Sequence, residues 1–420
     1  MKTNNNIPAY RFQGYTDAWE QRKLGEVADF SVKTNSLSRD KLSSYFYEVQ
    51  NIHYGDILTK YDVILNVSNE ELPSIIESKV SNFEDALLVE GDIVFADAAE
   101  DSTVGKAIEV RNLKGKNVVS GLHTIVARPK FSYAPYYLGY LINSTAYHNQ
   151  ILPLMQGTKV SSISKANLKL TTVAFPTLPE QEAIGSFFSD LDQLITLHQR
   201  KLDKLKEQKK TYLKLLFPAK GQTKPALRFQ GFEDDWKEVK LGEVVIWEKG
   251  SGLPKSDLNI EARGGKVIHY ADLYRYKEVI TEIFHSSESI EGKVIPLNSL
   301  LFPMSDVTPR GLARTSSISI EDVRAGGDIL IANIKDNSST FLSYQLNSNY
   351  QYILPLVTGT TVRHISSTSL STIPITLPTL PEQSAIGTFF QNLDQAIAQV
   401  EDKLASLKEM KKTLLRKLFA

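Results

Sequence analysis

The sequence predicts two α/β (α+β) domains of the same design, joined by a long antiparallel two-helix coiled coil. Two observations predict this fold class. The chain of 420 residues contains an internal repeat whose ends match closely while its middle diverges. Each copy of the repeat also ends in a long segment with heptad periodicity. The duplication implies a pseudo-two-fold relation between the two halves.

Two motifs mark the ends of the repeat. The opening motif, Arg11-Phe12-Gln13-Gly14 followed by Trp19 and Leu-Gly-Glu, returns at residues 228–243. The closing motif, Thr-Leu-Pro-Glu-Gln, stands at residues 177–181 and again at 379–383. Between the motifs, the two copies differ in length and in most of their residues. A repeated frame around divergent inserts suggests one scaffold that carries two different binding surfaces.

The repeat divides the chain into six parts. In order, these are an N-terminal segment (1–19), a first domain (20–176), a central helix (177–217), a linker (218–236), a second domain (237–378) and a C-terminal helix (379–420). Within both domains, short apolar β-type runs alternate with loops rich in Gly, Ser and Asn. This alternation indicates mixed α/β structure.

Composition excludes several classes of protein. The apolar share of 42% is enough to support sizeable cores. There are no cysteines, which excludes disulfides and thiolate metal sites and favours a reducing, cytoplasmic setting. The polar N-terminus does not resemble a signal peptide, and no apolar run is long enough to span a membrane. Because 48 basic side chains balance 48 acidic ones, any nucleic-acid binding must use a local face.

The closing motif predicts a helix start in each copy. Thr177-x-x-Glu180 reads as a capping box, in which the threonine hydroxyl accepts from the backbone and the glutamate reaches back. Pro179 stands in the first turn, where its missing N–H does no harm. Thr379 and Glu382 repeat the pattern.

A heptad seam follows each helix start, and it predicts that the two helices pair with each other. The candidate pairing residues are Phe188, Leu191, Ile195, Leu202, Leu205, Leu216, Phe390, Leu393, Ile397, Leu404, Leu407 and Leu418. An antiparallel pair with one domain at each end is the simplest layout. A helix of about 38 residues is roughly 57 Å long, which exceeds one turn of B-DNA, about 34–36 Å.

Each seam contains one lysine at the same heptad place, Lys209 and Lys411. One interpretation is an aliphatic stem that lies along the seam while the ammonium group reaches water. The other is a polar residue that fixes the register of the helix pair.

Polar and basic residues on glycine-flanked or turn-like loops are candidates for contact with phosphates or base edges. In the first domain they are Arg39, Lys159 and Ser161, and in the second they are Lys255, Arg363 and His364. For any single one of them, a solvated loop side chain is an equally good interpretation.

A repeated Ile-His-Tyr-x-Asp segment, at residues 52–56 and 268–272, could suggest a metal or acid–base site. One His and one Asp per domain make a poor metal shell, so a turn beside a strand is the favoured role and no metal site is predicted.

Motifs for catalysis are missing from the sequence. There is no G-x-x-x-x-G-K-[ST] phosphate loop, no Pro-Asp nuclease pattern and no Asn/Asp-Pro-Pro-Tyr segment of amino-methyltransferases. Neither a G-x-S-x-G nor an H-E-x-x-H motif occurs. These absences predict a chain that binds and positions other molecules and does not catalyse a reaction alone.

The repeated motifs resemble those of the specificity subunit of type I restriction–modification enzymes. They are Leu-Pro-Glu-Gln (178–181, 380–383), Leu-Asp-Gln (191–193, 393–395), Leu-Lys-Glu-x-Lys-Lys (205–210, 407–412) and Leu-Phe (216–217, 418–419), together with the two opening motifs. The resemblance covers nearly the whole chain. Where family members typically have Leu-Pro-Pro-Leu before Glu-Gln, this chain has Pro-Thr-Leu-Pro.

This resemblance implies two target recognition domains, each reading one half of a bipartite site in double-stranded DNA. It implies that the helices set the spacing and dock two methyltransferase subunits, which bind S-adenosylmethionine and flip adenine for N6 methylation. Two restriction (motor–nuclease) subunits would supply ATP- and Mg²⁺-dependent cleavage, and this chain would hold no cofactor. The alternative is a non-catalytic coiled-coil adaptor that joins two ligand-binding domains.

Overall fold

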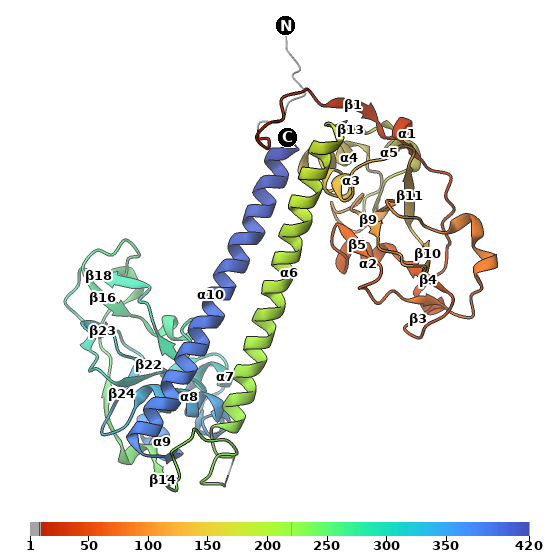
Figure 1. Cartoon of the computed structure of the whole chain (residues 1–420). Coiled ribbons are helices and arrows are strands. Elements are labelled where there is room, and N and C mark those ends of the chain that lie inside the picture. The colour runs from red at the N-terminus through yellow and green to blue at the C-terminus, as the bar shows by residue number, and fades with distance from the viewer. Residues whose placement is uncertain (1–7, 9, 220, 420) are drawn as a thin grey trace. The chain divides into compact units, whose positions relative to one another are not determined.

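The computed structural model describes residue 8, residues 10–219 and residues 221–419 (Figure 1). Most of the first half of the predicted N-terminal segment, residues 1–7 and 9, lies outside this range. The chain forms two compact units, residues 1–199 with 402–420 and residues 200–401. Each unit therefore combines one α/β domain with a part of both long helices, so its limits differ from the predicted domain limits.

The first unit contains two main sheets. The five-stranded sheet has the order β2 (Ala28–Asp29), β11 (Thr124–Pro129), β7 (Ile93–Ala96), β9 (Ala107–Arg111) and β5 (Ile64–Asn66). The four-stranded sheet has the order β10 (Asn117–Ser120), β4 (Val49–Ile52), β6 (Ser74–Ile75) and β3 (Leu42–Ser43). Two ribbons complete it, β1 (Glu20–Lys23) with β13 (Thr172–Phe175) and β8 (Ala98–Ala99) with β12 (Ser161–Ser162). The short helices are α1 (Leu24–Val27), α2 (Tyr54–Thr59), α3 (Tyr137–Ile142), α4 (Thr145–Ile151) and α5 (Lys165–Leu170).

The second unit repeats this plan. Its five-stranded sheet has the order β15 (Val245–Lys249), β24 (Ile329–Ile334), β20 (Ser299–Pro303), β22 (Ser316–Ile318) and β17 (Val279–Ile280). Its four-stranded sheet has the order β18 (His285–Ser287), β16 (Gly265–Ile268), β23 (Val323–Ala325) and β19 (Lys293–Val294). The ribbons are β14 (Lys237–Lys240) with β26 (Pro374–Leu377) and β21 (Ser305–Asp306) with β25 (Arg363–His364). The helices are α7 (Pro309–Leu312), α8 (Ser339–Ser348) and α9 (Ser367–Leu370). The predicted fold class, two copies of one mixed α/β domain, is confirmed.

The central strand of each five-stranded sheet is buried on both faces. In β7, Phe95 belongs to the core that includes the long helices, while Val94 belongs to a second core on the other face. In β20, Phe302 belongs to the core that includes the long helices, and Leu301 belongs to the core on the other face. This alternation follows from the two-residue period of a strand. It explains why these segments read as continuous apolar runs in the sequence.

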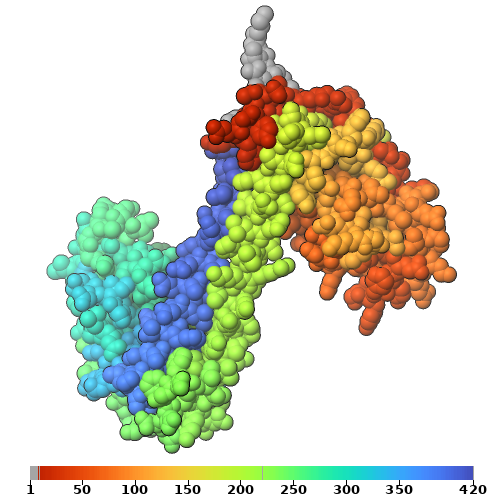
Figure 2. All heavy atoms as spheres, viewed as in Figure 1, coloured from red at the N-terminus to blue at the C-terminus, as the bar shows by residue number. Residues whose placement is uncertain are grey.

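The long helices are α6 (Leu178–Leu215) and α10 (Leu380–Leu418), against predicted ranges of 177–217 and 379–420. In the first unit, Phe188 near the start of α6 stacks on Phe419, just after the end of α10, with ring centroids 6.1 Å apart. In the second unit, Phe217 stacks on Phe390 at 5.9 Å. In each unit, the start of one long helix therefore packs beside the end of the other, and the pairing is antiparallel. Figure 2 shows the side chains of the two helices in contact on the visible face.

Seven of the twelve candidate pairing residues pack in or against the two cores that include the long helices: Phe188, Leu191, Ile195, Leu407 and Leu418 in the first unit and Leu216 and Phe390 in the second. Three of the twelve are half-buried: Ile195, Leu205 and Leu393. The others are buried: Phe188, Leu191, Leu202, Leu216, Phe390, Ile397, Leu404, Leu407 and Leu418.

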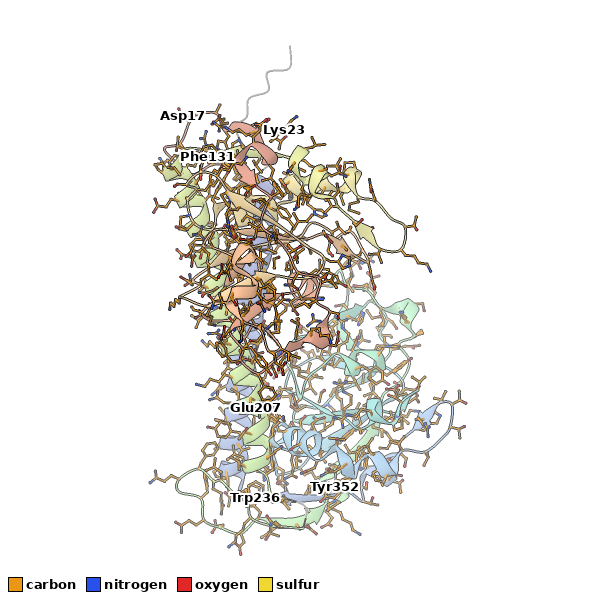
Figure 3. The ribbon with its side chains drawn as sticks, turned by 90° about the vertical axis from the view of Figure 1, so that its right-hand side faces the viewer. Asp17, Lys23, Phe131, Glu207, Trp236 and Tyr352 are labelled. Atoms are coloured by element: carbon orange, nitrogen blue, oxygen red, sulfur yellow. The ribbon has the colours of Figure 1, made fainter. Side chains whose placement is uncertain are left out.

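The tryptophans of the two opening motifs anchor those motifs in the cores. Trp19 is 4% exposed and its ring lies 6.2 Å from that of Phe419. Trp236, labelled in Figure 3, is 2% exposed and lies 5.6 Å from Phe341.

The capping-box prediction is wrong for both glutamates. The buried carboxylate of Glu180 accepts two hydrogen bonds from the Arg11 guanidinium, both at 2.6 Å. Glu382 accepts from Arg228 at 2.9 and 2.6 Å. A bidentate bond to a charged guanidinium is stronger than a bond to a neutral backbone N–H. The opening motif of each copy therefore closes onto the helix start of the same copy.

Each seam lysine is held by an aspartate of the other long helix. The Lys209 ammonium lies 2.7 Å from Asp394 and 3.0 Å from Glu278. The Lys411 ammonium lies 2.5 Å from Asp192. Both lysine side chains are less than one-fifth exposed. These contacts favour the register interpretation over a stem that reaches water.

A tyrosine hydroxyl of the domain completes each cluster. Tyr344 donates to Asp394 at 2.7 Å, and Tyr140 donates to Asp192 at 2.6 Å. Burial acts to lower the pKa of Lys209, but the neighbouring carboxylates outweigh burial and raise that pKa above its ordinary value. The charged form of the lysine is therefore stabilised where it lies.

Among the described residues, no helix is long and apolar enough to cross a membrane.

We predict that Asp192→Ala lowers the free energy of unfolding by about 1–2 kcal/mol, because it leaves the partly buried Lys411 without its carboxylate partner. Asp190→Ala is the matched control: Asp190 is exposed on the same helix, so its loss should change stability by at most about 0.5 kcal/mol. Urea unfolding of both variants measures the difference. Equal, small effects would show that the ion pair does not stabilise the helix contact.

Candidate nucleic-acid interface

The repeated Ile-His-Tyr-x-Asp segment forms the same turn in both units. It follows β4 in the first unit, where the Nδ1 atom of His53 accepts a hydrogen bond from the N–H of Gly55 at 3.2 Å and caps α2. It follows β16 in the second, where His269 accepts from Ala271 at 3.3 Å and caps the 3-10 helix η7 (Tyr270–Tyr274). Burial lowers the pKa of both histidines, which favours the neutral ring whose Nδ1 atom can accept these hydrogen bonds. The predicted role as a turn beside a strand is confirmed.

The aspartates of the two turns have different partners. In the first unit, Asp56 accepts a hydrogen bond from Arg39 at 2.8 Å. In the second unit, Asp272 accepts from the backbone N–H of His269 at 3.0 Å and lies 2.9 Å from His285. The aspartate of the repeated segment therefore binds Arg39 in the first unit and His285 of β18 in the second.

An open cleft of about 620 Å³ lies beside the turn in each unit. Arg39 lines the cleft of the first unit, and Lys255 lines that of the second. Both side chains are exposed. Further lining residues of the first cleft include Phe46, Gln50, Lys60 and Lys116, and those of the second include Ile260, Arg263 and Arg275. The two clefts have a similar position and different walls.

The other predicted residues lie on a short hairpin in each unit. Gly157 and Gly359 occupy the turns with φ of +103° and +97°, and a Cβ atom at Gly157 would lie 2.1 Å from the carbonyl oxygen of Val160. Glycine is therefore required at this turn. Lys159 is exposed on the first hairpin, and Ser161 is the first residue of β12.

In the second unit, β25 carries both predicted residues of the hairpin. The Arg363 guanidinium donates to the carbonyl oxygen of Gly359 at 2.5 Å. The Nδ1 atom of the exposed His364 lies 3.2 Å from the Ser305 hydroxyl. This bond uses one of the five N–H donors of the guanidinium, so Arg363 can keep it and still donate to a ligand.

Contacts between the turn and the hairpin make one continuous surface in each unit. In the second unit, the Tyr274 hydroxyl donates to the carbonyl oxygen of Ser305 in β21, which pairs with β25. In the first unit, the ring of Tyr54 lies 5.2 Å from that of His123, and His123 lies 3.2 Å from Asp97. Asp97 in turn accepts from the N–H of Ile163, just after β12. We call the linked turn and hairpin of each unit, residues 52–56 with 156–163 and residues 268–274 with 358–365, the turn–hairpin surface.

Sequence reasoning missed Lys60, Arg263 and Arg275 in the cleft walls. These residues lie in the divergent middle of each copy, where no repeated motif marks them. Their cationic charge is the kind that contacts phosphates.

Among the described residues, no group of three or more His, Asp or Glu side chains is placed to hold a metal ion.

Known proteins are similar to this chain in sequence and in fold. The type I restriction modification DNA specificity domain family matches residues 16–207 and again 233–409. The putative type I restriction enzyme MjaX specificity subunit of Methanocaldococcus jannaschii is 23% identical, over 95% of this chain and 92% of its own length. The MjaVIII specificity subunit of the same organism is 25% identical, over 63% of this chain and 64% of its own length.

A solved structure has the same fold over the whole chain. The crystal structure of the type I restriction–modification S subunit from M. genitalium covers 99% of both chains, with a TM-score of 0.60 and 16% identity. With two matches to the family that together cover most of its length, the chain belongs to the type I restriction modification DNA specificity domain family.

Proposed function

We propose that this chain is a DNA-binding specificity subunit whose two domains each read one half of a bipartite site. The duplicated turn–hairpin surface carries this proposal. The two surfaces share a frame, yet Arg39 stands in one where Lys255 stands in the other, and their clefts have different walls. Polar and basic side chains on such a surface suit phosphates and base edges. Two unlike surfaces on one chain suit two unlike half-sites.

The helices would set the spacing between the half-sites and dock two methyltransferase subunits. The Lys209–Asp394 and Lys411–Asp192 pairs support a fixed register, because a slip would separate each charge from its partner. A fixed register would hold the two domains at a fixed separation and would leave a constant number of base pairs unread.

Catalysis would belong to the partner subunits. The two methyltransferase subunits would bind S-adenosylmethionine and methylate adenine at N6, and two restriction subunits would use ATP and Mg²⁺ to cleave DNA. This chain would contribute recognition alone. Its net charge of zero suits a subunit whose grip on DNA is shared with partners.

We predict that cells expressing this chain with its methyltransferase subunit acquire N6-methyladenine at a single motif, made of two short half-sites and a gap of constant length. Methylome sequencing gives the motif directly. A gel shift with the motif, with and without the methyltransferase subunit, then measures binding. If neither specific methylation nor specific binding occurs, the chain is an adaptor that joins two other ligands.

We predict that Arg39→Ala, Lys159→Ala, Lys255→Ala and Arg363→Ala weaken DNA binding. Loss of a phosphate contact lowers affinity for all sequences and reduces the salt slope by about one unit. Loss of a base contact costs about 1–3 kcal/mol at one base pair. Lys237→Ala, at an exposed position of β14, is the control. Unchanged affinity and motif in all four variants would remove these loops from the interface.

A further inference from the structure

His123 and Asp328 occupy the same position in the two domains. His123 precedes β11 and Asp328 precedes β24, the equivalent strand of the other five-stranded sheet. The carbonyl oxygen of His123 accepts from the N–H of Asp97 at 3.0 Å. That of Asp328 accepts from Met304 at 2.9 Å. The place in the strand order and the backbone hydrogen bond are the same for both residues. His123 and Asp328 are therefore structurally equivalent although their side chains differ.

Both residues have a left-handed backbone, with φ of +52° at His123 and +61° at Asp328. Glycine adopts this conformation without a steric cost, and a side chain does not. Both side chains are nevertheless polar and exposed. Asp and His adopt this conformation more readily than most side chains, so the backbone alone assigns no role. What distinguishes this pair is that both side chains are polar, exposed and at the same strand entry in the two domains.

The surroundings of both residues belong to the turn–hairpin surface. His123 contacts Tyr54 and Asp97. The carbonyl oxygen of Asp328 accepts from the N–H of Met304, and the next residue, Ser305, accepts from the Tyr274 hydroxyl. His123 therefore contacts the turn of its unit through Tyr54, and Asp328 is linked to the turn of its unit through the Met304–Ser305 segment and Tyr274.

We propose that His123 and Asp328 read one base pair each, at equivalent places in the two half-sites, and that their different chemistry makes the half-sites differ. This inference rests on the proposed function. A carboxylate only accepts hydrogen bonds, so Asp328 selects the N4 amino group of cytosine in the major groove. The N6 amino group of adenine stands beside the N7 acceptor, which repels the second carboxylate oxygen. An imidazole both donates and accepts, so His123 does not share that preference.

Asp328→Asn tests the assignment in the complex of the full chain with its methyltransferase subunit. The carboxamide pairs with adenine N6 and N7, so one cytosine of one half-site should give way to adenine. Methylation at the original motif should fall about tenfold or more. The other half-site and the gap length should stay the same.

Asp336→Asn is the matched control, because Asp336 is exposed, has φ of +51° and follows the other end of β24. It should leave the motif and the rate unchanged. Asp328→Gly keeps the backbone conformation and removes the carboxylate, so it should fold with an unchanged or higher melting temperature and lose discrimination at that base pair.

The outcomes separate this inference from the proposed function. If the unaltered chain methylates a bipartite motif while Asp328→Asn and Asp328→Gly keep that motif and its rate, Asp328 does not read a base. If both half-sites change with Asp328→Asn, the effect passes through the whole fold and the assignment is also wrong. If the unaltered chain shows no motif at all, the proposed function itself fails.

Discussion

A partly buried ion pair between the two long helices, present once in each unit, is the contact on which the rest of the structure depends. In each unit, α6 and α10 supply one charge each, and a tyrosine of the domain donates to the aspartate: Lys411–Asp192–Tyr140 and Lys209–Asp394–Tyr344. One cluster thus joins three elements. Apolar seam residues tolerate a shift of one heptad. A charge in a partly buried contact does not, because a shift would separate it from its partner without returning it fully to water. The ion pairs therefore select one register from several that the seam alone permits.

Contacts that hold the scaffold are repeated in the two units, while contacts at the turn–hairpin surface are not. Arg11–Glu180 returns as Arg228–Glu382 with nearly the same geometry. By contrast, Asp56 binds a loop arginine while its counterpart Asp272 binds His285. This division lets one domain change its surface without changing how it joins the helices. In the proposed function, it would allow two domains with one frame to recognise different half-sites.

The sequence predicts what is local and misses what is distant. Heptad spacing finds α6 and α10 because neighbouring turns of a helix carry the pattern, and the two-residue pattern of β7 and β20 is equally local. The capping-box prediction at Thr177-x-x-Glu180 fails because it considers only neighbouring residues. The Glu180 carboxylate binds Arg11, which is 169 residues away in the sequence. Lys411 and Asp192 stand in motifs that the sequence singles out, yet no spacing rule pairs them. His123 and Asp328 have no sequence signal, because strand register creates their special position.

The central claim, that the paired helices fix the separation of two DNA half-sites, is tested by adding one heptad to both helices. Insertions near Leu205 and Leu407 lie between the two Lys–Asp pairs and keep the seam in phase. They lengthen the helix pair by about 10 Å at 1.5 Å per residue, roughly three base pairs at 3.4 Å each. Methylome sequencing should show the same half-sites with a gap about three base pairs wider. Methylation at the original spacing would contradict the account.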